Sequence, residues 1–186
     1  AIDGLLKQEF DVHREEGTAH YIIKKYNIEA IPYKCDKIDA WRHNFTGVQF
    51  YHKPTDFLVF GAVDDVWINP DGELIVVDYK STGANNYQIY PGYKRQMEIY
   101  QWLLTKNNYK VSKTGYFLFA KVNKDGGFSA GKLSFDLFIE PQEGDISWIE
   151  QSIFEAKKLL DGPVPGHNAE CPYCQFAKIQ DGSACV

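Results

Sequence analysis

Long apolar runs are missing from this sequence of 186 residues, and no stretch approaches the roughly 18 consecutive apolar residues that indicate a membrane-spanning helix. An excess of basic residues is missing as well, since 20 lysines and arginines stand against 25 aspartates and glutamates, a formal net charge of −5. This balance argues against bulk electrostatic attraction to nucleic acid, although it still allows a local basic groove. Because no apolar run is long enough to cross a bilayer, we expect no association with a membrane.

Internal repeats and low-complexity tracts are also absent. Hydrophobic residues make up 44% of the chain and charged residues 24%, which is typical of globular proteins and excludes a disordered or fibrous chain. A chain of this length suits a single domain, since domains usually contain roughly 100–200 residues. We predict one domain over residues 1–186, with a cysteine-containing tail at residues 163–186.

Cysteine is scarce, because the chain contains 4 cysteines, too few for a disulfide scaffold. We therefore expect a reducing, cytoplasmic environment. Three of the cysteines lie close together near the end of the sequence, which indicates a metal or cluster site there. The four are Cys35, Cys171, Cys174 and Cys185.

Hydrophobic periodicity indicates a helix, strands, a helix, strands and a helix, in this order. The order is typical of a mixed β-sheet flanked by helices, and not of a sheet in which every strand is followed by a helix. Helices are expected at residues 4–26, 93–106 and 145–160, with a short one at 38–45, and the tail shows little periodicity. Strands are expected at residues 48–52, 57–68, 73–80, 114–122 and 131–140.

Carboxylates interrupt the apolar centre of the sequence. Asp64 and Asp65 lie within the strand predicted at residues 57–68, where burial of an unpaired charge is costly. Asp78 and Lys80 lie in the next strand and share one of its faces, because side chains alternate along a strand. A tight hairpin can bring Asp64 close to Asp78, and two carboxylates suit Mg²⁺ or Mn²⁺. The spacing is equally compatible with a buried Asp–Lys salt bridge. Asp65 alternates to the other face, so we interpret it as structural or as a support for the ligands.

The helix predicted after these strands carries Gln96 and Tyr100 on one face, one turn apart. Three segments in this order resemble the PD-(D/E)XK nuclease superfamily, and more closely its RecB/Cas4-like branch. In that branch the pattern is Gly-x-hydrophobic-Asp, then Asp/Glu-x-Lys, then Gln-x-x-x-Tyr on the next helix. The matching segments are Gly61-Ala62-Val63-Asp64, Asp78-Tyr79-Lys80 and Gln96-Met97-Glu98-Ile99-Tyr100.

The resemblance implies an α/β, restriction-endonuclease-like fold with a central mixed β-sheet flanked by α-helices. It implies a Mg²⁺- or Mn²⁺-dependent deoxyribonuclease that hydrolyses phosphodiester bonds, as an exonuclease or end-processing enzyme rather than a sequence-specific one. The implied partners are DNA, single-stranded or as duplex ends, and a protein such as a helicase.

The resemblance also assigns roles to individual residues. The implied metal ligands are Asp64, Asp78 and the backbone carbonyl of Tyr79. Lys80 would be the catalytic lysine. Gln96 would hold the metal-bound water, Lys80 or the scissile phosphate, and Tyr100 would support the DNA backbone.

The same branch often has an upstream histidine as a further metal ligand, in a Gly-x-x-x-His setting. Gly17-Thr18-Ala19-His20 is similar but one residue shorter, so His20 is the candidate ligand, with His52 and His43 as rivals. The alternative for each histidine is an ordinary hydrogen bond in the core or at the surface.

In Cas4-like nucleases, one early and three late cysteines hold an iron–sulfur cluster. Cys35, with Cys171, Cys174 and Cys185, has this one-plus-three layout, which implies a [4Fe–4S] cluster. The spacer of ten residues between Cys174 and Cys185 departs from the family, in which it is shorter. Four thiolates also suit Zn²⁺, and a tail that binds no metal is the third alternative.

Two other classes of function fit parts of this pattern. A non-catalytic nucleic-acid-binding subunit would keep the fold, but it leaves the Asp64, Asp78 and Lys80 set without a purpose. A cysteine-ligated metal or redox protein would depend on Cys171 and Cys174, and it leaves the strand carboxylates unexplained.

Overall fold

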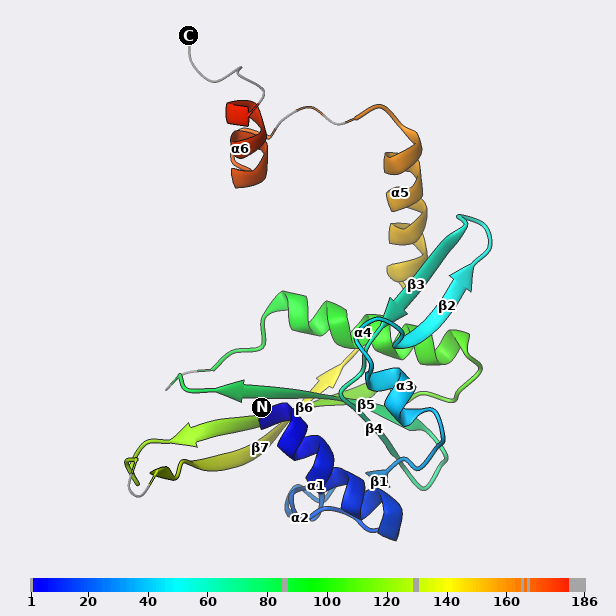
Figure 1. Cartoon of the computed structure of the whole chain (residues 1–186). Coiled ribbons are helices and arrows are strands. Elements are labelled where there is room, and N and C mark those ends of the chain that lie inside the picture. Colours follow the sequence, from blue (N-terminus) through cyan, green and yellow to red (C-terminus); the bar gives the residue numbers. More distant parts are fainter. Residues whose placement is uncertain (1, 85–86, 129–130, 165, 167, 181–186) are drawn as a thin grey trace. The chain divides into compact units, whose positions relative to one another are not determined.

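The computed structural model describes residues 2–84, 87–128, 131–164, 166 and 168–180 (Figure 1). The chain divides into two compact units, Ala1–Ile149 and Glu150–Val186. The first unit contains α1 (Ile2–Glu16), α2 (Tyr21–Lys25), β1 (Ile31–Pro32), α3 (Ile38–Arg42), β2 (Val48–His52), β3 (Phe57–Gly61), β4 (Asp65–Ile68), β5 (Leu74–Thr82), α4 (Pro91–Lys106), β6 (Thr114–Asn123) and β7 (Ser134–Glu143). The second unit contains α5 (Ile149–Asp161), which begins at the last residue of the first, and α6 (Pro172–Gln180).

The first unit is built around a mixed β-sheet with the strand order β1-β4-β5-β6-β7. Strands β5 and β6 are parallel, and the other neighbours are antiparallel. Two parallel neighbours need a crossover connection, and α4 provides it between β5 and β6. The prediction of an α/β fold with a central mixed sheet and flanking helices is therefore confirmed.

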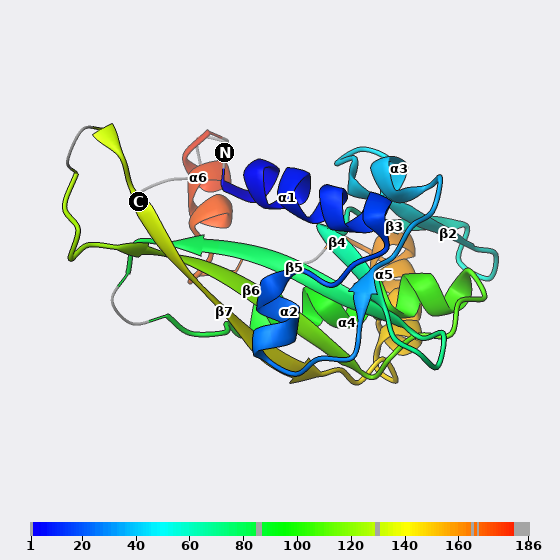
Figure 2. The ribbon, with the colours of Figure 1, turned by 90° about the horizontal axis from the view of Figure 1, so that it is seen from below.

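Helices α1 and α4 lie on opposite sides of this sheet (Figure 1). Figure 2, seen from below, shows α1 running alongside β5, and its Phe10 ring stacks on Trp67 of β4 with centroids 5.6 Å apart. On the other side, α4 comes so close to β6 that a Cβ added to Gly115 would lie 2.3 Å from Met97 Sδ. Glycine is therefore required at this position for close helix–sheet packing.

The single strand predicted at residues 57–68 is wrong, because the chain changes sheets in the middle of it. Strand β3 pairs with β2 in a separate two-stranded sheet, whereas β4 joins the central sheet. Between the two strands, the Val63 amide donates to the Trp41 carbonyl at 3.0 Å, and the Asp64 carbonyl accepts from Arg42 Nε at 3.0 Å. These bonds to α3 replace strand pairing, so the chain bends at Asp64.

The helix predicted at residues 4–26 is also wrong, since it is divided into α1 and α2. Gly17 has φ = +65° after the end of α1, a left-handed conformation that favours glycine. His20 then caps α2, accepting a hydrogen bond from the Ile22 amide at 3.2 Å. In the second unit, the tail without visible periodicity contains helix α6.

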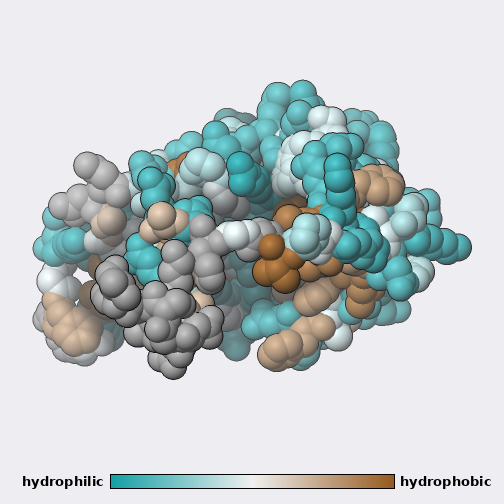
Figure 3. Space-filling model, turned by 90° about the horizontal axis from the view of Figure 1, so that it is seen from above, coloured by the Kyte–Doolittle hydropathy of each residue, from teal (hydrophilic) through white to brown (hydrophobic). Residues whose placement is uncertain are grey.

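The surface seen from above is largely hydrophilic, with hydrophobic residues in smaller patches between the teal ones (Figure 3). None of the helices in the described part of the chain combines the length and apolar character that crossing a membrane requires.

Candidate active site

Asp64 lies at the bend before β4 and is held from three sides. Its Oδ2 accepts a hydrogen bond from the Tyr79 amide at 3.0 Å, and its Oδ1 lies 2.9 Å from Lys7 Nζ of α1. Its carbonyl is bound by Arg42 as described above. In the antiparallel β4–β5 register, Asp65 lies opposite Val77, so the preceding residue, Asp64, comes opposite Asp78. The hairpin therefore brings the two carboxylates together.

Asp78 is buried on β5, with 2% of its surface exposed. Burial raises the pKa of Asp78 to about 6, and the negative charges of Asp64 and Asp3 also raise it, whereas Lys80 lowers it. The Lys80 ammonium forms an ion pair with Asp78 Oδ2. A raised pKa that results from burial beside a second carboxylate is typical of functional carboxyl groups.

Lys80 is oriented by helix α4 as well as by Asp78. Its Nζ lies 3.5 Å from Gln96 Oε1 and 4.5 Å from the centroid of the Tyr93 ring. Gln96 in turn donates from Nε2 to the Tyr100 hydroxyl at 2.7 Å. Burial is the main cause that raises the pKa of Tyr100 to about 12, so this hydroxyl stays protonated at neutral pH. Gln96 thus connects the lysine of β5 to a buried tyrosine of α4.

Gly61, the first residue of the Gly-x-x-Asp segment, has a packing role. A Cβ added at this position would lie 2.6 Å from Tyr100 Cε1 and 3.0 Å from Cδ1. Any larger residue would push the Tyr100 ring away, and Tyr100 holds Gln96. The glycine therefore links the bend before Asp64 to the helix that orients Lys80.

Asp65 is fully buried behind the site and bonded on all sides. Its Oδ1 pairs with Arg14 of α1 and with Arg42 Nη2 at 3.3 Å. Its Oδ2 accepts from the Tyr79 hydroxyl at 2.6 Å. Arg42 also donates from Nη1 to both carboxylate oxygens of Asp11 at 2.9 Å. Asp65 thus joins α1, α3 and β5 into one frame around the bend.

Sequence reasoning missed the contribution of α1 and α3 to the site. Lys7, Asp11 and Arg14 recur at intervals of four and three residues, the spacing of one helix face, and they flank the buried Phe10. The sequence could have indicated this contribution, because these charged side chains lie on the helix face that also carries a buried aromatic residue. Arg42 had no comparable signal in the sequence.

The donor set fits a hard divalent cation. Asp64 and Asp78 supply carboxylate oxygens, and the Tyr79 carbonyl belongs to the residue whose amide binds Asp64. Asp78 Oδ2 is buried, and the Lys80 ammonium is its partner among the described residues. No group of three His, Cys, Asp or Glu side chains in the described ranges is arranged to hold a metal ion. Mg²⁺ commonly binds through one or two carboxylates, with waters and substrate phosphates completing its shell.

His20 has both ring nitrogens in use within the protein. Its Nδ1 accepts from the Ile22 amide, and its Nε2 lies 2.7 Å from Glu9 Oε1. Burial lowers the pKa of His20, and its ring stacks on Phe10 with centroids 4.4 Å apart. We therefore leave His20 out of the proposed ligand set.

The rival histidines have protein partners too. His52 is buried, and its Nδ1 lies 2.7 Å from Thr55 Oγ1. His43 accepts a hydrogen bond from the Phe45 amide at 3.3 Å.

The cysteines are placed in different parts of the chain. Cys35 belongs to the first unit and precedes α3, whereas Cys171 directly precedes α6 and Cys174 lies in its first turn, both in the second unit. Cys185 lies outside the described residues. Hydrogen bonds from the backbone of Cys174 and Tyr173 lower the pKa of Cys171. The four-cysteine metal site stays a prediction.

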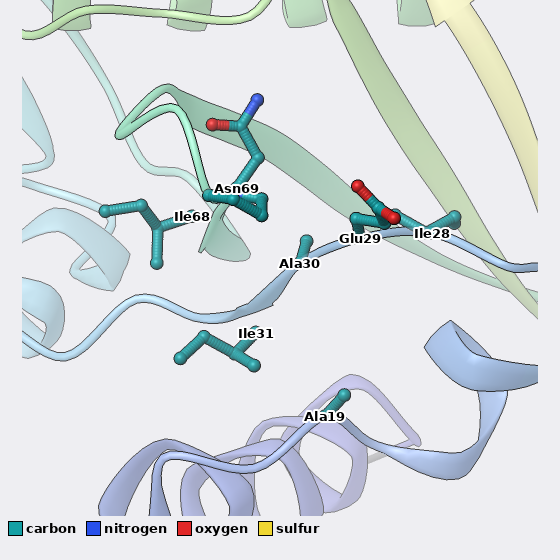
Figure 4. Close-up of a pocket in the computed structure, with 8 residues that line it drawn as sticks. Ala19, Ile28, Glu29, Ala30, Ile31, Ile68 and Asn69 are labelled. Carbon is teal, nitrogen blue, oxygen red and sulfur yellow. The ribbon is translucent and has the colours of Figure 1, made fainter.

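Figure 4 shows a pocket of about 500 Å³ in the first unit. It is lined mainly by small and aliphatic side chains, such as Ala19, Ile28 and Ile31, together with Glu29 and Asn69. None of its lining residues is a carboxylate or lysine of the candidate site around Asp78.

Comparisons with known proteins identify the family of this chain. A model of the PD-(D/E)XK nuclease superfamily matches residues 1–179. No curated protein matches the chain. The crystal structure of SSO0001 is similar at 22% sequence identity and a TM-score of 0.38, and the alignment covers 66% of this chain and 51% of that one, about half its length. The family match extends over nearly the whole sequence, and this chain therefore belongs to the PD-(D/E)XK nuclease superfamily.

Proposed function

We propose that this protein is a Mg²⁺- or Mn²⁺-dependent deoxyribonuclease of the RecB/Cas4-like branch, acting as an exonuclease or end-processing enzyme. Members of its superfamily are typically nucleases that use divalent metals such as Mg²⁺. One observation carries the proposal: the hydrogen bond from the Tyr79 amide to Asp64 keeps Asp64 beside the strand segment of Asp78 and Lys80. Two carboxylates and the Lys80 ammonium thus meet at one end of a β-hairpin.

The metal would be held by Asp64, Asp78 and the Tyr79 carbonyl. When bound, such a cation polarises a phosphoryl oxygen and lowers the pKa of a bound water. A backbone amide fixes Asp64 and burial fixes Asp78, so both ligands are positioned before the metal arrives. Preorganised ligands cost little reorganisation when the reaction occurs.

Lys80 would position the attacking water and stabilise the charge that develops on the phosphate. Its ammonium is held over the Tyr93 ring and beside Gln96, so it remains at the site when the metal replaces it as the partner of Asp78. Tyr100 is almost completely buried, and we assign it the positioning of Gln96.

DNA as the substrate, its free ends and a helicase partner are proposed from the resemblance of the sequence motifs. The test is digestion of labelled single-stranded and duplex DNA, with open and blocked ends, in Mg²⁺, Mn²⁺ or EDTA. We expect cleavage only with metal and faster degradation from open ends. The matched control is Lys80→Ala with unchanged circular dichroism.

Two results would contradict parts of the proposal. Metal-independent DNA binding without cleavage by the wild-type protein would indicate a non-catalytic subunit. Equal cleavage of open and blocked substrates would indicate an endonuclease.

A further inference from the structure

The outer oxygen of Asp64 is occupied by a lysine from a distant part of the chain. Lys7 Nζ of α1 lies 2.9 Å from Asp64 Oδ1, and the two side chains are 24% and 23% exposed. The other oxygen, Oδ2, is bound to the Tyr79 amide. Oδ1 is therefore bound by a side chain, whereas Oδ2 is bound by the backbone.

The two lysines of the site differ in how they are held. Lys80 contacts Asp78, Gln96 and the Tyr93 ring, so three neighbours fix its ammonium. The Lys7 ammonium has Asp64 as its polar partner among the described residues. A lysine is a compact charge on a flexible four-carbon chain, so Lys7 can leave Asp64 without disturbing α1.

A divalent cation and Lys7 compete for the same carboxylate. Mg²⁺ binds carboxylate oxygens at about 2.1 Å and would share Asp64 with an ammonium already in hydrogen-bonding contact. Like charges at such separation repel, so the lysine has to move away from the metal position. We propose that Lys7 is an exchangeable cation, which neutralises Asp64 in the metal-free enzyme, is displaced by the divalent cation and then binds a phosphate oxygen of the substrate. This inference rests on the proposed nuclease function.

Phosphate is the anion that suits the displaced ammonium. Asp78 is buried and paired with Lys80, and Asp11 is bound by Arg14 and Arg42, so neither carboxylate is available to Lys7. Asp3, one helical turn before Lys7, is the alternative acceptor in α1. A phosphodiester held at the metal would bring anionic oxygens to the exposed side of the site, where Lys7 already lies.

The first experiment measures metal affinity without DNA. Titration calorimetry with MnCl₂ compares the wild type with Lys7→Met, which keeps the apolar stem, and with Lys7→Arg, which keeps the charge. Because a partly exposed ion pair contributes at most about 1 kcal/mol, we expect Lys7→Met to bind Mn²⁺ roughly two- to fivefold more tightly. Lys34→Met is the matched control, since Lys34 pairs with Glu15 of α1 on the surface at 2.6 Å. It should leave the affinity unchanged.

The second experiment measures the phosphate contact at saturating Mn²⁺. The logarithm of kcat/KM for DNA cleavage is plotted against the logarithm of the KCl concentration. Loss of one phosphate contact should reduce the slope for Lys7→Met by about 0.7–0.9, with lower kcat/KM at low salt. Lys7→Arg and Lys34→Met should keep the wild-type slope.

The outcomes separate this inference from the proposed function. A wild type that binds no Mn²⁺ would overturn both. A wild type that binds Mn²⁺ and cleaves no DNA would overturn the proposed function, and the Mn²⁺ affinity of Lys7→Met would still decide the exchange. An active Lys7→Met variant with unchanged or weaker Mn²⁺ binding would overturn the exchange alone, and would make Lys7 a structural partner of Asp64. Tighter Mn²⁺ binding with an unchanged salt slope would overturn the phosphate contact and indicate that Lys7 moves to Asp3.

Discussion

Replacing Asp78 with asparagine should stabilise the metal-free protein above pH 6. The folded state raises the pKa of Asp78 from 3.8 to about 6, mainly through burial. A group with a raised folded pKa stabilises the fold when it is protonated. That contribution is complete below the unfolded pKa of 3.8 and is lost as the pH rises through about 6.

The magnitude follows from the shift. Two pKa units correspond to about 3 kcal/mol of unfolding free energy, since one unit is about 1.4 kcal/mol. Asp78 is almost completely buried, so screening by solvent does not reduce this value appreciably. An asparagine side chain cannot ionise, so the Asp78→Asn variant should lack the loss of stability that the wild type shows between about pH 4 and pH 6.

The assay is urea unfolding in EDTA at pH values from 4 to 8, with the difference between variant and wild type plotted against pH. We expect this difference to rise by about 3 kcal/mol across the transition and then to level off. Asp71→Asn, at an exposed turn residue, is the matched control and should show no such rise. A difference that is constant over the whole pH range would refute the reasoning. Adding Mg²⁺ at pH 8 should stabilise the wild type more than the variant, because only the wild type has both carboxylate ligands.

Three further substitutions and one modification test other parts of the site. Lys80→Ala should lower kcat by orders of magnitude at saturating metal while circular dichroism stays unchanged, and full activity in the folded variant would exclude a catalytic role. Gln96→Ala should reduce kcat clearly less than Lys80→Ala, because Gln96 is neutral and acts by positioning; equal losses would contradict this. Gly61→Ala should lower the unfolding free energy by roughly 1–3 kcal/mol in urea, because its methyl group would overlap the Tyr100 ring, and unchanged stability would contradict the packing. The rate at which iodoacetamide alkylates Cys171, followed by mass spectrometry, should rise with pH at a midpoint below that of free cysteine, because the Cys171 pKa is lowered. A midpoint at or above that of free cysteine would contradict the lowered pKa.

Local geometry made the central constellation predictable from the sequence. Residues two apart share a strand face, so the common face of Asp78 and Lys80 needed only the correct assignment of one strand. A tight turn between adjacent strands brings Asp64 opposite Asp78, and helical spacing places Gln96 and Tyr100 on one face. Each of these relations spans at most one hairpin or one helical turn, and periodicity describes such distances well.

Other local patterns were misleading because tertiary contacts overruled them. The apolar run at residues 57–68 has strand propensity throughout, yet hydrogen bonds from α3 to Val63 and Asp64 divide it. The helical periodicity of residues 4–26 also continues past Gly17, yet α1 ends before that glycine and His20 caps α2 by accepting from the Ile22 amide. Propensity cannot predict which hydrogen-bond partners the rest of the chain will offer.

The sequence by itself determined which residues meet in the candidate site, since strand alternation and the turn between β4 and β5 bring Asp64, Asp78 and Lys80 together. Only the tertiary structure decided how they are supported. The ion pair between Arg14 and Asp65 joins residues 51 positions apart, and Lys7 reaches Asp64 from another helix. Pairings of this kind depend on which face of α1 packs against the sheet, and that choice results from burial of apolar surface across the whole unit.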